Sequence, residues 1–116
     1  MKLRLIGVFL LVLFSTHVFS HAVVTEHSLK IAEVTANTPK TVTLTFNSKV
    51  EIGLSQIFLV SAGDKHDLLK LGKGQKQGDV TVDLPALLPG KYALRYKIFA
   101  ADGHLTEDFI HFSVKQ

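Results

Sequence analysis

The sequence contains no cysteine and no tryptophan, and its one methionine is Met1. Without cysteine the chain can form no disulfide bond, carry no lipid on a cysteine anchor and offer no thiolate to a metal ion. Without methionine beyond Met1 it also lacks the thioether sulfur that soft metal ions prefer. Its fold must therefore be held by an apolar core alone, and any metal ion must be bound by nitrogen and oxygen.

Long apolar runs are also scarce, with one exception at the N-terminus. A basic start, Met1–Arg4, precedes the apolar run Leu5–Phe14, and Ser15–Ser20 ends in small residues. This order is typical of a secretory signal peptide, and the run is shorter than the roughly 18–20 residues that span a bilayer. We therefore expect residues 1–20 to be cleaved on secretion, with an uncleaved anchor as the alternative. Cleavage there makes His21 the first residue.

The mature chain, residues 21–116, is long enough for one small domain and not for two. Removal of Lys2 and Arg4 lowers its formal charge from +3 to +1. The remaining lysines are scattered among acidic residues and form no basic patch interleaved with aromatic residues, so we expect no nucleic-acid partner. We expect the domain to be a monomer.

Alternation of apolar and polar residues with a period of two is the main signal of secondary structure. It is clearest in Thr41–Asn47 and recurs in Tyr92–Phe99 and Ile110–Lys115, which predicts half-buried strands. Further strands are predicted at His21–Ser28, Ser55–Val60, Leu68–Leu71 and Val80–Leu84, with a turn at Gly63–Asp67 and a loose connection at Ile31–Thr38. About seven short strands, with no helical periodicity over three turns, favour an all-β, two-sheet antiparallel sandwich.

The tripeptide Asp102-Gly103-His104 lies between the last two predicted strands. Asp-Gly is a strong hairpin-turn signal. In extended backbone, side chains two residues apart leave the same face, so Asp102 and His104 are expected side by side. A carboxylate beside an imidazole at the rim of a sheet can be a structural corner, half of an acid–base pair or half of a metal site.

An N-terminal His21 carries an imidazole and a free α-amine, which together can chelate one metal ion. Their ordinary pKa values, about 6.5 and about 7.7–8, allow a metal to displace their protons at neutral pH. A sandwich brings the first strand and the last hairpin into one small body, so His21 can meet Asp102 and His104. Three nitrogens and one oxygen suit Cu(II), with Zn(II) binding more weakly. The alternative is that cleavage leaves a histidine there by chance.

The remaining histidines are expected to take no part in this site. His27 would lie about 20 Å from His21 along an extended strand, too far to share an ion, and is expected to be solvated or locally hydrogen-bonded. His66 is expected to be solvated, and His111 falls on the polar side of the last strand.

Four segments together resemble the periplasmic copper-binding protein family CopC. They are "HAVV" at the mature start, "TPKTVTLTFNSKVE", "LPGKYALRYKIFAADGH" and the closing "HFSV", and the resemblance covers residues 21–116. It implies an immunoglobulin-like Greek-key β-sandwich or barrel with one Cu(II) per chain, bound by the residues matching His21, Asp102 and His104. It also implies copper resistance, storage or delivery without catalysis, and an inner-membrane copper transporter of the CopD type as a partner.

The sequence departs from the family at a few positions. Ser48 stands where some members have a glutamate that is a proposed additional ligand, so Glu51, Glu107 or Asp108 would have to supply such an oxygen. Tyr96 replaces the tryptophan expected in the final hairpin. None of these changes affects the three core ligands.

Two other classes of function stay open on the sequence. One is an oxidative copper enzyme that uses an N-terminal histidine brace on polysaccharide, although two tyrosines and no tryptophan poorly supply the flat aromatic face of such enzymes. The other is a metal-free adhesion or chaperone module, in which His21 is incidental.

Overall fold

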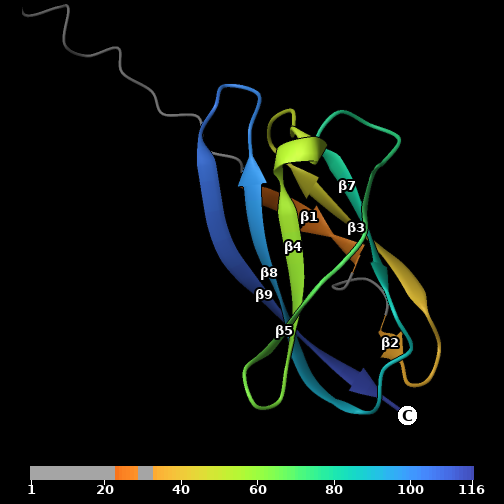
Figure 1. Ribbon diagram of the computed structural model, residues 1–116. Coiled ribbons are helices and arrows are strands. Elements are labelled where there is room, and N and C mark those ends of the chain that lie inside the picture. Colours follow the sequence, from red (N-terminus) through yellow and green to blue (C-terminus); the bar gives the residue numbers. More distant parts are fainter. Residues whose placement is uncertain (1–22, 29–32) are drawn as a thin grey trace, which may run out of the picture.

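The computed structural model describes residues 23–28 and 33–116, which are almost entirely β-structure (Figure 1). Over these residues, no helix is long and apolar enough to cross a membrane. The elements are β1 (Val24–His27), β2 (Val34–Thr35), β3 (Lys40–Phe46), the 3₁₀ turn η3 (Ile52–Leu54), β4 (Gln56–Ser61), β5 (Lys65–Leu68), β6 (Leu71–Lys73), β7 (Asp79–Leu84), β8 (Gly90–Phe99) and β9 (Leu105–Lys115).

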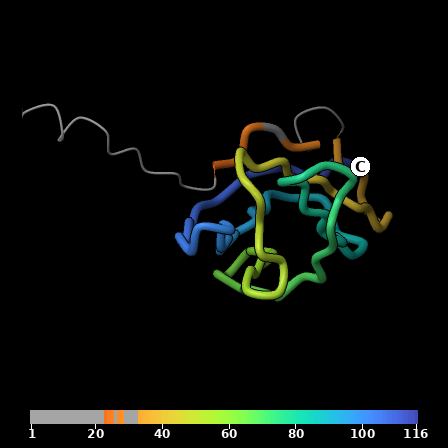
Figure 2. Tube along the Cα trace, turned by 90° about the horizontal axis from the view of Figure 1, so that it is seen from above, coloured from red at the N-terminus to blue at the C-terminus, as the bar shows by residue number. Residues whose placement is uncertain are grey.

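The strands form two sheets with the orders β1-β3-β7-β6 and β2-β9-β8-β4-β5. All neighbours are antiparallel except β2 and β9, which pair in parallel. The consecutive strands β3 and β4 lie in different sheets, so their connection crosses from one sheet to the other, as in Greek-key sandwiches. Seen from above, the trace closes around the core (Figure 2). The all-β, two-sheet architecture predicted from the alternation is confirmed.

The core lies between the two sheets and follows the predicted alternation. In β3 and β7 the residues of the core cluster are Val42, Leu44, Phe46, Val80, Val82 and Leu84; in β4 and β8 they are Ile57, Leu59, Leu94, Tyr96 and Ile98. Phe46 and Tyr96 meet across the core edge to face, with ring centroids 5.5 Å apart, an arrangement that aromatic pairs prefer. Burial, and secondarily the charge of Asp108, raises the pKa of Tyr96.

The predicted strand Leu68–Leu71 is wrong, because the chain changes sheets inside it. The Leu69 N–H donates to Ile57 O of β4 at 2.9 Å, whereas Lys70 O accepts from the Asp83 N–H of β7 at 3.1 Å. β5 therefore ends before this point and β6 begins after it. The four residues themselves cannot reveal such a crossing, because it is decided by hydrogen bonds to the distant residues Ile57 and Asp83.

Other boundaries also differ from prediction; β9, for example, begins at Leu105 and not at Ile110. β5 begins at Lys65, so the predicted turn Gly63–Asp67 is shorter than expected, and β2 falls within the predicted connection Ile31–Thr38. Both strands are edge strands: β5 is fully exposed and β2 is only two residues long. Neither therefore carries a full period of alternation that could be recognised.

Candidate metal centre

The β8–β9 hairpin turns at Ala100–His104. The Gly103 N–H donates to Ala100 O, and the Ala100 N–H donates to His104 O, both at 2.9 Å. Gly103 has a φ of +91°, a conformation that glycine adopts without steric cost. A three-residue loop of this kind, closed by a glycine in the left-handed region, is a common hairpin connection. The turn predicted from Asp-Gly is confirmed.

Within this turn, Asp102 and His104 are joined by two contacts. His104 Nδ1 lies 3.0 Å from Asp102 Oδ2, and the His104 backbone N–H donates to Asp102 Oδ1 at 3.0 Å. The second contact is the local bond by which an aspartate commonly stabilises a turn two residues on. The two side chains thus meet as predicted, but through the turn itself and not through alternation along an extended strand.

The pairing determines the charge of Asp102 and the orientation of the His104 ring. The side-chain hydrogen bond from His104, followed by its backbone N–H, lowers the pKa of Asp102, so the carboxylate is ionised near neutral pH. A carboxylate that holds a ring nitrogen of a histidine fixes the orientation of that ring, as is common beside metal ions. The side chains of His104 and Asp102 are 48% and 38% exposed, so this pair lies at an accessible rim.

The connection between β3 and β4 braces the turn. Lys49 O accepts from the Ala101 N–H at 2.9 Å, and the Glu51 N–H donates to Phe99 O at 2.8 Å. These two bonds hold both the end of β8 and the first residue of the loop, so the turn is attached on two sides and is not a free hairpin tip.

The same connection holds the beginning of the described chain. Asn47 Oδ1 accepts from the Val23 N–H at 2.9 Å, and the Asn47 N–H donates to Val23 O at 3.0 Å. Because Lys49, two residues after Asn47, binds the turn, Val23 lies at the same end of the sandwich as Asp102 and His104. That end is at the top of Figure 1, where the β8–β9 turn is seen.

His21, the third predicted ligand, lies outside the described residues. In the parts of the chain that are described, no group of three or more His, Cys, Asp or Glu side chains is arranged to hold a metal ion. The structure therefore brings together two of the three predicted ligands, Asp102 and His104, and leaves the third as a prediction.

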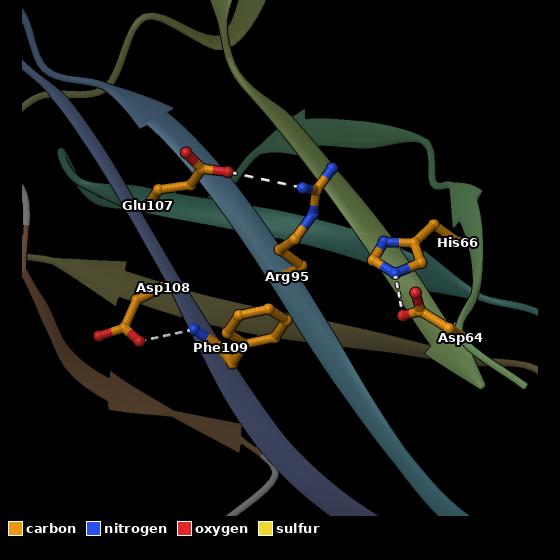
Figure 3. Close-up of polar contacts among 6 residues, drawn as sticks. All are labelled: Asp64, His66, Arg95, Glu107, Asp108 and Phe109. Atoms are coloured by element: carbon orange, nitrogen blue, oxygen red, sulfur yellow. Dashed lines mark hydrogen bonds and ion pairs between the residues drawn. The ribbon is translucent and has the colours of Figure 1, made fainter. Parts of the chain in front are cut away.

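The residues considered as additional oxygen ligands have other surroundings. Glu107 Oε2 pairs with Arg95 Nη1 at 3.5 Å, and Asp108 Oδ1 accepts from the Phe109 N–H at 2.8 Å (Figure 3). The Ser48 hydroxyl is buried and, over the described residues, has no hydrogen-bond partner.

The histidines set aside in the sequence analysis also have local surroundings. His66, expected to be solvated, instead binds Asp64, with Nε2 2.8 Å from Oδ1 (Figure 3), and its side chain is only 28% exposed. His111 stacks on Phe109 with ring centroids 6.1 Å apart. The sequence signal for the first contact is the pattern Asp-x-His, with Asp64 at the end of a turn.

Comparison with known proteins identifies the family. The family model of the CopC domain matches residues 24–115. The chain belongs to the CopC family. Protein YobA of Escherichia coli K12 is 33% identical to it over 104 residues, which cover 84% of this chain and 82% of that protein. Protein YobA of Shigella flexneri matches equally.

Two solved structures share the fold. CopC from Methylosinus trichosporium OB3b is 28% identical, with a TM-score of 0.67 over 82% of this chain and 94% of that one. PcoC, a methionine-rich copper resistance protein from Escherichia coli, is 17% identical, with a TM-score of 0.61 over 83% of this chain and 100% of that one. The Greek-key β-sandwich predicted from the resemblance to CopC is thereby confirmed.

Proposed function

We propose that this protein is a periplasmic carrier that binds one Cu(II) per chain for copper resistance, storage or delivery, and that it is not an enzyme. Its ligands are the α-amine and imidazole of His21, together with Asp102 and His104. Membership of the CopC family supports a copper-binding role. Export with removal of residues 1–20 is part of this proposal, and the mass of the exported protein tests it.

The observation that carries the proposal is the Asp102–His104 pair, whose atoms are 3.0 Å apart, at the end of the sandwich to which Val23 is attached. His21 precedes Val23 by two residues, which span at most about 7 Å of chain. Chain length therefore keeps His21 near the end that carries the pair.

The donors suit Cu(II). Imidazole nitrogen and amine nitrogen are ligands for which Cu(II) has the highest affinity of the divalent first-row ions, and the set lacks the soft sulfur that Cu(I) prefers. The ionised Asp102 partly neutralises the cation and orients the ring of His104. The partial exposure of both side chains leaves a route for transfer of the ion, as a carrier requires. A monomer that exchanges copper with an inner-membrane transporter of the CopD type fits this arrangement.

The free amine provides the sharpest test. One alanine added before His21 keeps every side chain but removes the amine–imidazole chelate. We expect Cu(II) affinity to fall by orders of magnitude, measured by competition titration of the native and extended mature proteins. Their melting temperatures without metal serve as the control for folding. Equal affinities would contradict the proposed ligand set.

A further inference from the structure

The connection between β3 and β4 touches both halves of the proposed copper site. Its first residue, Asn47, holds Val23 through the two hydrogen bonds at 2.9 and 3.0 Å, and Lys49, two residues later, holds Ala101 through its carbonyl at 2.9 Å. A segment of three residues therefore sets the distance between the beginning of the N-terminal strand and the turn that carries Asp102 and His104.

The attachment at Asn47 matters because the N-terminal strand is otherwise weakly held. β1 contains only four residues, and its pairing with β3 is irregular between Val24 and Glu26. Val23 is half exposed, so little burial retains it. Chain ends with so few contacts tend to fray unless specific hydrogen bonds hold them. The Asn47 side-chain oxygen accepts such a bond from the Val23 N–H, in addition to the backbone bonds between β1 and β3.

We propose that Asn47 is a positioning residue for copper binding: its side chain fixes where the N-terminal strand begins, so that His21 is already near Asp102 and His104 before the ion arrives. The inference rests on the proposed function. Ordering a ligand in advance raises affinity, because less conformational freedom is lost on binding. Asn47 is not a ligand in this proposal, and it acts only through His21.

The experiment compares Cu(II) affinities of mature variants by competition titration. Asn47→Ala removes the acceptor and is expected to lower the affinity by roughly 10-fold, the lower end of the loss found when residues that orient metal ligands are replaced. Asn47→Asp keeps an oxygen in the same place and should restore the affinity. Thr41→Val is the matched control, because it removes another exposed side-chain bond, from Thr41 Oγ1 of β3 to Asp83 Oδ1 at 3.2 Å.

The same measurements in a His21→Ala background separate positioning from a general effect on the fold. There the N-terminal strand keeps only its α-amine and has lost the amine–imidazole chelate, so Asn47→Ala should lower the remaining affinity by clearly less than in the wild-type background, as expected when a double-mutant cycle detects coupling. An equal loss in both backgrounds would overturn the inference, as would a loss in Thr41→Val as large as that in Asn47→Ala.

Failure of this inference is distinguishable from failure of the proposed function. If His21→Ala binds Cu(II) as tightly as the wild type, the ligand set itself is wrong. If His21→Ala is impaired but Asn47→Ala is not, the copper site stands and only the positioning role of Asn47 is refuted.

Discussion

Two hairpin turns of this protein carry the same pattern, Asp-x-His, and form similar pairs. In the β8–β9 turn, Asp102 and His104 are 3.0 Å apart, and in the β4–β5 turn, Asp64 and His66 are 2.8 Å apart. The contact alone therefore does not distinguish a metal ligand from a local ion pair.

The two pairs differ in their position and in which ring nitrogen they use. In the pairing of β4 with β8, Val60 lies opposite Ala93 and Gln56 opposite Lys97, so the β4–β5 turn is at the end of the sandwich away from Val23. His66 contacts Asp64 through Nε2, whereas His104 contacts Asp102 through Nδ1. The backbone N–H of His104 also donates a hydrogen bond to Asp102. Asp64 is 90% exposed and Asp102 is 38% exposed. Its place at the end of the sandwich that holds Val23, and not the pattern, makes one pair a candidate site.

The largest difference is expected when each histidine is removed. His104→Ala should lower Cu(II) affinity by roughly two orders of magnitude or more, because a nitrogen ligand is lost, whereas His66→Ala should leave it unchanged. Competition titration of both variants against the wild type measures this. A larger loss of Cu(II) affinity in His66→Ala than in His104→Ala would contradict the assignment of the copper site to the β8–β9 turn.

Copper should also stabilise the fold by joining the two ends of the chain. A ligand that binds only the folded state contributes about 4 kcal/mol at a thousandfold excess over its Kd, which for a domain of this size raises Tm by roughly 10 °C or more. His66→Ala should keep this rise, and His21→Ala should lose most of it while melting near wild type without metal. Thermal scans with and without Cu(II) test it, and equal responses would show that the ion does not join the ends.

Removal of each carboxylate should give a smaller difference in Cu(II) affinity between the two pairs. Asp102→Ala should lower Cu(II) affinity by roughly 10–100-fold, because it removes an oxygen donor and the group that orients His104. Asp64→Ala should have no effect on copper. Equal Cu(II) affinities of the two variants would show that Asp102 has no special role in copper binding.

The glycines of the two turns offer a matched pair of backbone changes. Gly103 and Gly63 have φ values of +91° and +80°, and a Cβ atom added at either would meet no atom within 4 Å. Each change to alanine should therefore destabilise the fold by a similar amount, about 1–2 kcal/mol, through backbone strain alone. Chemical denaturation measures this cost. Only Gly103→Ala should also weaken Cu(II) binding, since it distorts the turn between Asp102 and His104.

The smallest expected effect concerns acid stability without metal. Because pairing with His104 lowers the pKa of Asp102 below its ordinary 3.8, the ionised carboxylate stabilises the folded state above that pH. The contribution is lost as the pH falls through the lowered pKa of the folded state. Asp102→Asn should therefore melt below wild type at pH 5, and the difference should disappear as the solution is acidified through the lowered pKa of Asp102. A constant difference across this range would show that the pair does not stabilise the fold through the charge of Asp102.

Much of the fold was predictable, because its determinants are local. Val42, Leu44 and Phe46 alternate with threonines, and this alternation alone assigns one face of β3 to the core. Asp102-Gly103 likewise specifies a turn through the conformational preference of glycine. Both signals lie within a few residues, so the sequence by itself determined the all-β class, the last hairpin and the proximity of Asp102 to His104.

Tertiary structure alone decided the features that depend on pairing between distant segments. Nothing near Leu69 or Lys70 indicates that the chain changes sheets there, because that crossing depends on Ile57 and Asp83. In the sequence, Asn47 resembles any polar residue at the end of a strand. Its proposed role depends on two long-range contacts of the same short segment: Asn47 binds Val23, and Lys49 binds Ala101. The choice between two Asp-x-His turns has the same origin: what distinguishes them is the position of the N-terminal strand, which long-range hydrogen bonds determine.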